Sequence, residues 1–239
     1  MQQFSTFELL GFGPNGWGFA LLRATGMTLA VALCGFLVGA LIGTLVAVAK
    51  LSRSLPARLV GDTYTTVLRG VPDLLVIYLF YFGGSAVLTG IGEWFGADGF
   101  IGLPAFATGA LAIGVISAAY QAEVFRGAYL TLDRGELEAA RAVGMSPGLM
   151  LRRIVGPQVL RYAIPGLGNV WQLALKESAL ISVTGLVELL RQSQIGAGST
   201  YKPFYFYLTA AMLYLAITTV STWGFERAET HSMRGMRTA

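Results

Sequence analysis

A group of polar side chains interrupts an otherwise apolar stretch in the C-terminal half of the chain. Lys176 and Glu177 are adjacent there. Three hydrogen-bonding side chains are close to them in the sequence: Ser178, Gln172 and Asn169. Ionisable groups are costly within a membrane and usually face a cavity or a partner. An amino acid offers a carboxylate for Lys176 and, if it is basic, a cation for Glu177. We therefore predict that this group contacts a small charged solute.

A second interpretation of the same charges is structural. Adjacent residues on a helix point about 100° apart, so Lys176 and Glu177 are poor partners for each other. Asn169 and Gln172 are three residues apart and share one helix face. The two charges could instead brace the helix bundle or an interface with a second subunit. The sequence leaves both interpretations open.

The residues needed for covalent chemistry are missing. ATP binding would require a Gly-rich loop followed by Lys and Ser or Thr, and none of the chain's three lysines has that context. The only cysteine is Cys34, and the only histidine is His231. A zinc or haem site is therefore not expected, and a disulfide within the chain is excluded. We predict a chain without enzymatic activity and without a cofactor of its own.

The composition indicates a membrane protein. Apolar residues make up 54% of the 239 residues and charged residues only 13%, about half of what soluble domains contain. The 31 glycines fit this class as well, because transmembrane helices are rich in Gly. No basic stripe interleaved with aromatic residues is present, so nucleic-acid binding is not expected. We predict one membrane domain over residues 1–239.

Long uncharged runs define the predicted membrane spans. Each has about the 20 residues that a helix needs to cross the hydrocarbon core. The run that contains Lys176 and Glu177 is included because the sidedness of the neighbouring segments requires it. The five predicted spans cover approximately residues 19–50, 67–92, 100–127, 162–188 and 203–226.

The positive charges are unevenly distributed among the connections. Thirteen of the 17 Lys and Arg residues follow the first, third and last predicted spans. They are Lys50, Arg53, Arg58, Arg69, Arg126, Arg134, Arg141, Arg152, Arg153, Arg161, Arg227, Arg234 and Arg237. Cytoplasmic connections carry the excess of basic residues in membrane proteins. This predicts five spans, with the N-terminus outside and the C-terminus in the cytoplasm.

The longest hydrophilic connection, residues 131–161, is predicted to form two short helices. Asp133 followed by Glu136 has the spacing of a capping box, which starts a helix. Gly144 suits the left-handed position just past that helix. Ser146 and Pro147 then favour the start of a second helix.

The second helix of this connection is predicted to end before Pro157. Such an ordered connection is typical of a docking element. It could also be a loop whose helices rest on the lipid headgroups, and the spacing alone does not decide between these interpretations. Glu123 and Arg126, just before the connection, have the spacing of a helix-surface ion pair.

One pattern in this connection resembles a known family. Residues 138–140 read Glu-Ala-Ala, and Gly144, Ile154 and Pro157 follow at fixed intervals. The pattern resembles the EAA loop of ABC importer permeases, with Gly156 where the family has Leu. The resemblance implies a helix-turn-helix that inserts into a groove on an ATPase subunit. The docking residues that it implies are Glu138, Ala139, Ala140 and Gly144.

Further segments resemble one subgroup of these permeases. They are residues 68–74 (LRGVPDL), 122–128 (AEVFRGA), 165–169 (PGLGN) and 176–180 (KESAL). They are similar to the polar amino-acid permeases, and most similar to those that import histidine, arginine and opines. The resemblance runs from about residue 20 to the end of the chain.

The resemblance implies an all-α fold of the type I ABC importer permease kind in the bacterial inner membrane. It also implies an identical or homologous partner permease, a solute-binding protein outside, and two ATPase subunits that bind ATP and Mg²⁺. Five helices enclose too small a ring for a translocation path, which agrees with pairing between this chain and a second permease subunit. The alternative is a dimeric ion- or proton-coupled secondary transporter of amino acids. It would need a titratable relay within the spans, for which only Lys176 and Glu177 are available.

Overall fold

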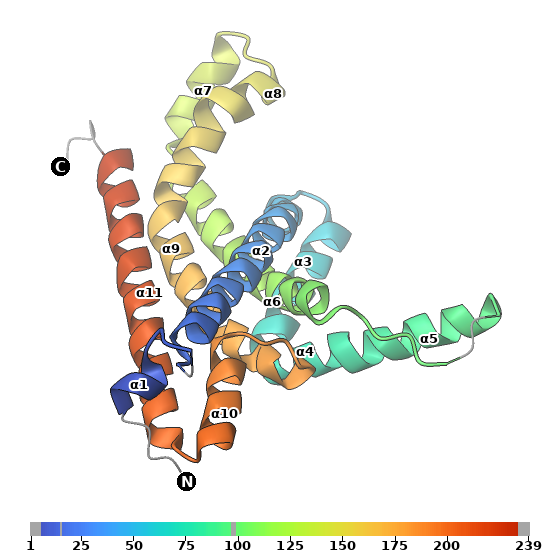
Figure 1. Cartoon of the computed structure of the whole chain (residues 1–239). Coiled ribbons are helices and arrows are strands. Elements are labelled where there is room, and N and C mark those ends of the chain that lie inside the picture. Colours follow the sequence, from blue (N-terminus) through green and yellow to red (C-terminus); the bar gives the residue numbers. More distant parts are fainter. Residues whose placement is uncertain (1–5, 15, 97–98, 234–239) are drawn as a thin grey trace.

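The computed structural model describes residues 6–14, 16–96 and 99–233. These residues form helices and no β-strand, which confirms the all-α prediction (Figure 1). The elements are α1 (Thr6–Leu10), α2 (Gly18–Leu51), α3 (Leu55–Gly70), α4 (Asp73–Tyr78), η1 (Leu79–Gly83), α5 (Gly84–Trp94), α6 (Ala105–Leu130), α7 (Arg134–Ala142), α8 (Pro147–Met150), η2 (Leu151–Val155), α9 (Gly156–Glu177), η3 (Ser178–Thr184), α10 (Leu189–Thr200) and α11 (Pro203–Ser232). Of the η elements, η1 and η2 are π-helical and η3 is a 3₁₀-helix.

Four helices in the described residues are long and apolar enough to cross a membrane. They are α2, the continuous helix Asp73–Trp94, α6 and α11. Each overlaps one predicted span. The remaining predicted span, residues 162–188, falls on α9 and η3, and α9 is less apolar because it carries the polar residues described above. Its passage across the membrane therefore stays a prediction.

The second predicted span, residues 67–92, does not begin where the helix does. α3 ends at Gly70, and Val71 and Pro72 are extended before α4 starts. Pro72 has no N–H to donate, and its ring disfavours a helical conformation at Val71. α3 is a separate amphipathic helix that the sequence analysis missed. It packs back on α2 and α6, where the Tyr64 hydroxyl donates to the Val115 carbonyl oxygen at 2.6 Å.

The helix in the fourth predicted span is also shorter than expected. α9 ends at Glu177, and η3 carries the chain to Gly185, whose φ of +88° marks a left-handed turn. α10, which the sequence analysis also missed, follows. Its first amides, from Leu190 and Arg191, donate to the Glu188 carboxylate at 2.8 and 2.7 Å. Glu188 is therefore the cap that starts α10.

The centre of the bundle is the crossing of α2 over α6. Gly35, Gly39 and Gly43 all face α6 and are buried. An added Cβ at Gly35 would lie 2.7 Å from the Cβ of Ile113, and one at Gly39 would lie 2.1 Å from the Ser117 hydroxyl. The small residues thus let the two backbones approach closely, as expected from their spacing.

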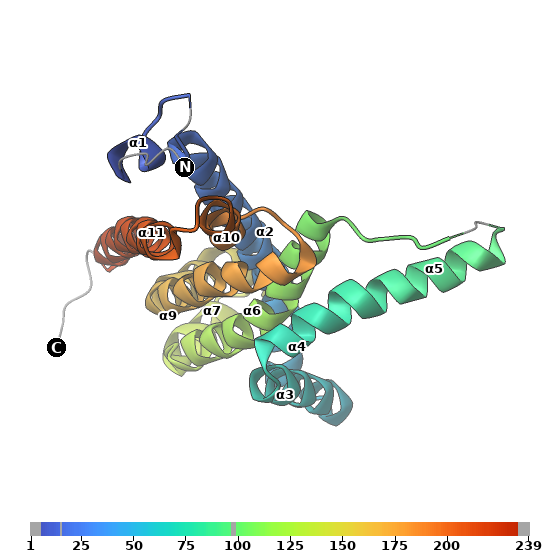
Figure 2. The same ribbon diagram turned by 60° about the horizontal axis from the view of Figure 1, so that its bottom comes forward.

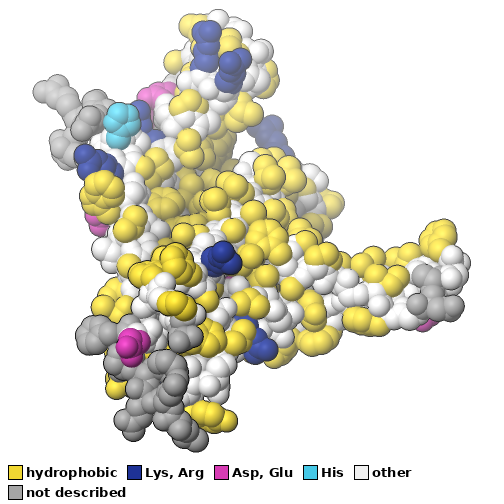
Figure 3. Space-filling model, viewed as in Figure 1, with side chains coloured by type: hydrophobic (Ala, Val, Ile, Leu, Met, Phe, Trp, Pro, Cys, Tyr) yellow, Lys and Arg dark blue, Asp and Glu magenta, His cyan; other side chains and the backbone are white. Residues whose placement is uncertain are grey.

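Figures 1 and 2 show how the other helices are arranged around this crossing. α9 and α11 run side by side, and α9 also packs on α6. The helix formed by α4, η1 and α5 leaves the bundle and projects to one side. Many hydrophobic side chains are visible along it in the space-filling view (Figure 3). Side-chain hydroxyls of Ser85 and Thr89 accept hydrogen bonds from the returning backbone at Leu103 and Ile101.

Gly35→Ala is expected to destabilise the α2–α6 crossing. The new methyl group would collide with the branched Cβ of Ile113, which cannot rotate away, and overpacking of this kind costs about 1–3 kcal/mol. Gly26→Ala is the control, because nothing lies within 4 Å of its added Cβ. Thermal unfolding of the purified chain in detergent measures the difference. Equal melting temperatures for the two variants would contradict the close crossing.

Candidate functional site

The connection of residues 131–161, here called the coupling segment, begins as the sequence predicts. The Asp133 side chain accepts a hydrogen bond from the Gly135 amide at 2.8 Å and caps α7. Glu136 does not complete a capping box. Its carboxylate instead accepts from the Gln158 amide group at 2.5 Å, which ties α7 to the start of α9.

The turn after α7 also matches its prediction. Gly144 has a φ of +78°, the left-handed conformation that favours glycine. Its amide donates to Arg141, and the Met145 amide donates to the Ala140 carbonyl oxygen at 3.1 Å. These two bonds close the end of the helix in a Schellman-type arrangement. Ser146 then caps α8 through the Leu149 amide at 3.4 Å.

The predicted end of the second helix before Pro157 is wrong. α8 continues through the π-helical turn η2 directly into α9, and Pro157 lies in the first turn of α9. A proline ring collides with the carbonyl four residues earlier in a regular α-helix, and the wider π-turn relieves this. Gly156 fits the same turn, because a Cβ there would lie 2.9 Å from the Leu151 carbonyl oxygen. The coupling segment is therefore joined to α9 without a hinge.

The predicted docking residues do not share one environment. Glu138, Ala139 and Gly144 are exposed. Ala140 is only 5% exposed. The exposed surface that a partner can reach is thus formed by the first two residues of the Glu-Ala-Ala pattern and by the turn.

Glu177 occupies an unusual position at the end of α9. Its side chain is 2% exposed, and no amide, hydroxyl or cationic group of the described residues donates a hydrogen bond to either carboxylate oxygen. The neighbouring Asp73 carboxyl is within hydrogen-bonding reach of it, so the two acids can share a proton. The Asp73 carboxylate, at the start of α4, and the Tyr120 hydroxyl, on α6, are close enough to interact with it electrostatically. The Arg69 guanidinium lies over the Tyr120 ring at 5.4 Å from its centre. Four helices, α3, α4, α6 and α9, thus bring two acids, an aromatic ring and a guanidinium together.

The other predicted contact residues point elsewhere. Lys176 is exposed, on a different side of α9 from Glu177, as the angle between helix neighbours predicts. Ser178 is buried and donates to the Leu175 carbonyl oxygen at 2.7 Å. Its hydroxyl is therefore occupied by its own helix.

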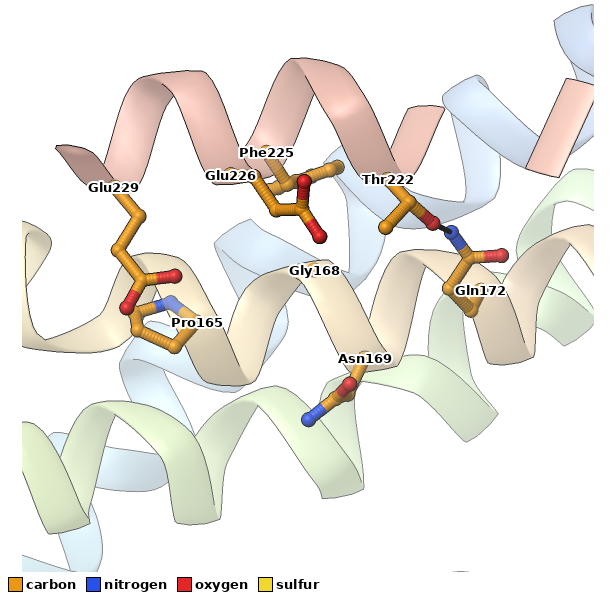
Figure 4. A pocket seen from close by; sticks show the side chains of 8 residues that line it. All are labelled: Pro165, Gly168, Asn169, Gln172, Thr222, Phe225, Glu226 and Glu229. Carbon is orange, nitrogen blue, oxygen red and sulfur yellow. Dashed lines mark hydrogen bonds between the residues drawn. The ribbon is translucent and has the colours of Figure 1, made fainter. Parts of the chain in front are cut away.

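Asn169 and Gln172 line a groove of about 260 Å³ between α9 and α11 (Figure 4). The Gln172 amide donates to the Thr222 hydroxyl at 2.8 Å. Glu226 and Glu229 of α11 point toward α9 across the same groove in Figure 4. The structure therefore separates the predicted five-residue group into a buried acid, an exposed lysine and a groove.

Asp73 and Tyr120 were missed as members of the site. The sequence analysis treated residues 68–74 only as part of a resemblance. Pro72 could have indicated that a new helix starts at Asp73, so that an acid stands at a helix N-terminus. No local pattern marks Tyr120, because its proximity to Glu177 arises only from the packing of α6 on α9.

An ionic network links three helices, α2, α3 and α6. The Glu123–Arg126 pair is present as predicted, at 3.0 Å. Lys50 at the end of α2 also bonds to Glu123, and it reaches Asp62 of α3 at 3.0 Å. The sequence analysis had counted Lys50 only as one of the cytoplasmic charges.

The fold and these features agree with the comparison to known proteins. The chain matches the family described as binding-protein-dependent transport system inner membrane component over residues 17–229. It therefore belongs to this family and is a permease subunit of an ABC importer. This supports the importer interpretation and gives no support to the secondary transporter.

Several similar permeases are known. The octopine transport system permease protein OccQ of Rhizobium meliloti is 61% identical over 230 residues, covering 96% of this chain and 97% of that protein. The nopaline transport system permease protein NocQ of Agrobacterium fabrum is 50% identical, with 96% and 98% covered. The histidine/lysine/arginine/ornithine permease HisQ of Salmonella typhimurium is 39% identical, with 86% and 90% covered.

Solved structures give the same result. A crystal structure of an amino acid ABC transporter with histidines is 32% identical to this chain, with a TM-score of 0.75 and coverage of 90% of this chain and 95% of that one. The MetNI methionine ABC transporter in an inward-facing conformation is 19% identical, with a TM-score of 0.65 and coverage of 98% of this chain and 100% of that one. At this identity the likeness shows a shared fold.

Glu123→Gln is expected to lower the free energy of unfolding by about 2 kcal/mol. The Lys50 side chain is only 7% exposed and would keep only the exposed Asp62 as a charged partner, and breaking a buried pair is strongly destabilising. Arg126→Gln is the control, because that side chain is 39% exposed and surface pairs contribute less than about 1 kcal/mol. Chemical denaturation in detergent compares the two. Equal losses would show that Lys50 does not depend on Glu123.

Proposed function

We propose that this chain forms the translocation path of an importer for an opine or a cationic amino acid. The names of its relatives support this class, since they include octopine, nopaline, arginine and histidine. Octopine, nopaline and arginine all carry a guanidinium group. The observation that carries the proposal is the buried Glu177 carboxylate, which receives no hydrogen bond from an amide, hydroxyl or cation of the described residues and has only a second acid, Asp73, beside it.

The chemistry around Glu177 suits a cation. A buried carboxylate without a partner is strongly unfavourable, and the neighbouring Asp73 adds negative charge. A guanidinium arriving with the solute would supply both charge and directed hydrogen bonds. The Tyr120 ring holds the Arg69 guanidinium by a cation–π contact, which shows that this part of the bundle accommodates a guanidinium beside the two acids.

The roles within the predicted contact group can now be assigned more narrowly. We place the solute's cation at Glu177 and Asp73 and its carboxylate at the exposed Lys176. The side chains of Ser178 and Gln172 support the site only indirectly, because each already donates within the chain. Asn169 lies in the groove with α11. Within this chain only the Asp73 carboxyl is within hydrogen-bonding reach of the Glu177 oxygens, and no cation of the described residues pairs with them.

The complete importer is proposed to contain further subunits. An identical or homologous permease completes the path, a solute-binding protein delivers the solute, and two ATPase subunits bind ATP and Mg²⁺. The N-terminus lies outside and the C-terminus in the cytoplasm, with α9 as the fourth of five spans. The basic residues on the connections support this orientation.

The coupling segment is proposed to dock on the ATPase through the exposed residues Glu138, Ala139 and Gly144. Ala140, which the sequence pattern also predicted as a docking residue, is buried and is not part of that surface. α8, η2 and α9 form one uninterrupted helix from Pro147 to Glu177. A displacement of the docked segment is therefore transmitted along α9 to the residue proposed to hold the solute. This connection supports alternating access driven by ATP.

Gly144→Ala is expected to weaken ATPase association about 5- to 30-fold. A side chain at a φ of +78° strains the turn by about 1–2 kcal/mol, which distorts the docking surface. Gly148→Ala is the matched control, because Gly148 lies in α8 with open space around its added Cβ and no positive φ. Titration of the purified ATPase against permease in nanodiscs gives both affinities. If the two variants bind equally well, Gly144 does not shape the docking surface.

Glu177→Gln is expected to lower kcat/KM for uptake of a guanidinium-bearing solute about 10- to 100-fold. The change keeps the shape and removes the charge, and a hydrogen bond to a charged group contributes about 1.5–3 kcal/mol. Asp73→Asn should act in the same direction. Uptake into proteoliposomes that contain the assembled importer provides the measurement. Glu226→Gln, an exposed acid in the groove with α11, is the control and should transport normally.

The same preparation identifies the solute. Octopine, nopaline, arginine and histidine are compared for stimulation of ATPase activity in the assembled complex. Lys176→Ala should raise KM for the preferred solute, because it removes the partner of the carboxylate. Unchanged uptake by both Glu177→Gln and Lys176→Ala would remove these residues from the proposed path, while leaving the assignment to the family intact.

A further inference from the structure

Three arginines converge on a pocket beside the coupling segment. The pocket has a volume of about 360 Å³ and lies between the α2–α3 turn, the end of α6 and α7. Arg53 comes from the turn, and Arg134 and Arg141 come from α7. Basic side chains gather on the end of the molecule formed by α7 and α8 (Figure 3). The pocket therefore draws cations from two segments far apart in the sequence.

The charges of these arginines are not neutralised within the chain. All three side chains are exposed. No hydrogen bond or ion pair holds them to another residue in the part of the chain that the structure describes. The only acid that lines the pocket is Glu138. By contrast, Arg126 near the end of α6 does not line the pocket and is paired with Glu123. The pocket thus keeps a net positive charge and suits an anionic group.

The position of the pocket along α6 indicates where that group comes from. α6 is one of the apolar helices long enough to cross a membrane, and it ends at Leu130. Tyr129 and Leu130 form the edge of the pocket on the side of that helix, and Leu130 is 60% exposed. An aromatic residue at the end of a spanning helix is typical of the headgroup level. The pocket therefore combines a cationic rim with an apolar edge at the membrane surface.

We propose that this pocket binds the phosphate group of an anionic phospholipid from the surrounding bilayer. Basic pockets at this level bind anionic headgroups, and Arg presents several donors to phosphate oxygens in a fixed geometry. The lipid bridges Arg53 of the α2–α3 turn and the two arginines of α7. It thereby holds the coupling segment against the membrane-embedded helices. This site is separate from the solute path at Glu177.

The test uses the assembled importer in nanodiscs of phosphatidylcholine with increasing phosphatidylglycerol. Native mass spectrometry counts the phosphatidylglycerol molecules that stay bound. The pocket variant combines Arg53→Gln, Arg134→Gln and Arg141→Gln. The control combines Arg58→Gln, Arg152→Gln and Arg153→Gln, which removes the same charge from exposed arginines that do not line the pocket.

The pocket variant should bind phosphatidylglycerol on the order of 100-fold more weakly, because each arginine near an anionic lipid contributes roughly fivefold. The control should bind as the wild type does. Equal binding by both variants would overturn the proposal. Displacement of the lipid by excess inorganic phosphate would indicate a site for free phosphate instead. Loss of the ATPase from the complex with lipid binding unchanged would indicate that the arginines face the ATPase.

The single variant Arg53→Gln keeps the test decisive if the triple variant does not assemble. Arg53 lies outside the coupling segment, so α7 and its turn remain intact. Roughly fivefold weaker binding of phosphatidylglycerol is expected, with normal ATPase association. Binding equal to that of Arg58→Gln would refute the role of the pocket.

Discussion

The close contact of α2 with α6 is the interaction on which the remaining helices depend. Glycines at every fourth position leave room for one backbone on the other, and side chains at the crossing are buried. Near one end of α2, Lys50 joins α3 and α6 through Asp62 and Glu123. Toward the other end, the Thr28 hydroxyl accepts the Leu189 amide at 3.1 Å and holds the start of α10. One rigid rod therefore positions elements from the whole length of the chain.

The uninterrupted helix from α8 to α9 adds a second rigid element. Its π-turn accommodates Pro157 and leaves the helix unbroken, so the coupling segment cannot pivot freely at its second end. The first end is fastened by the bond from Gln158 to Glu136 and by the ion pairs at the end of α6. Force applied to the coupling segment is therefore carried into the bundle. A flexible loop at this place would dissipate the same displacement.

The features that the sequence predicted are those that local chemistry determines. Asp133 caps its helix and Gly144 forms its turn because each depends only on the backbone a few residues away. Apolar runs likewise revealed four helices able to span a membrane. α3 and α10 were not predicted because both are short and only partly apolar. Because proline restricts the residue before it, the break at Pro72 could be predicted from the sequence. The second predicted span nevertheless crossed Pro72, because the uncharged run after this residue was extended to include the residues before it.

The site could not be assembled from the sequence because its members come from different helices. Lys50 lies 73 residues from Glu123, and nothing local pairs them. Asp73 and Glu177 meet only because α4 and α9 both pack on α6. Grouping the polar residues of α9 by sequence proximity therefore joined side chains that the helix sends in different directions. The angle between neighbours separates Lys176 from Glu177 even though they are adjacent.

Two glutamates that are both buried differ sharply in their hydrogen bonding. Glu188 is fully buried, and its carboxylate accepts from two backbone amides and from the hydroxyls of Thr28 and Tyr214. Its charge is thereby stabilised by the fold itself. Glu177 is almost as deeply buried but has no such bonds among the described residues. No amide, hydroxyl or cation of the described residues compensates its charge, which leaves these oxygens available to the cation of the proposed solute.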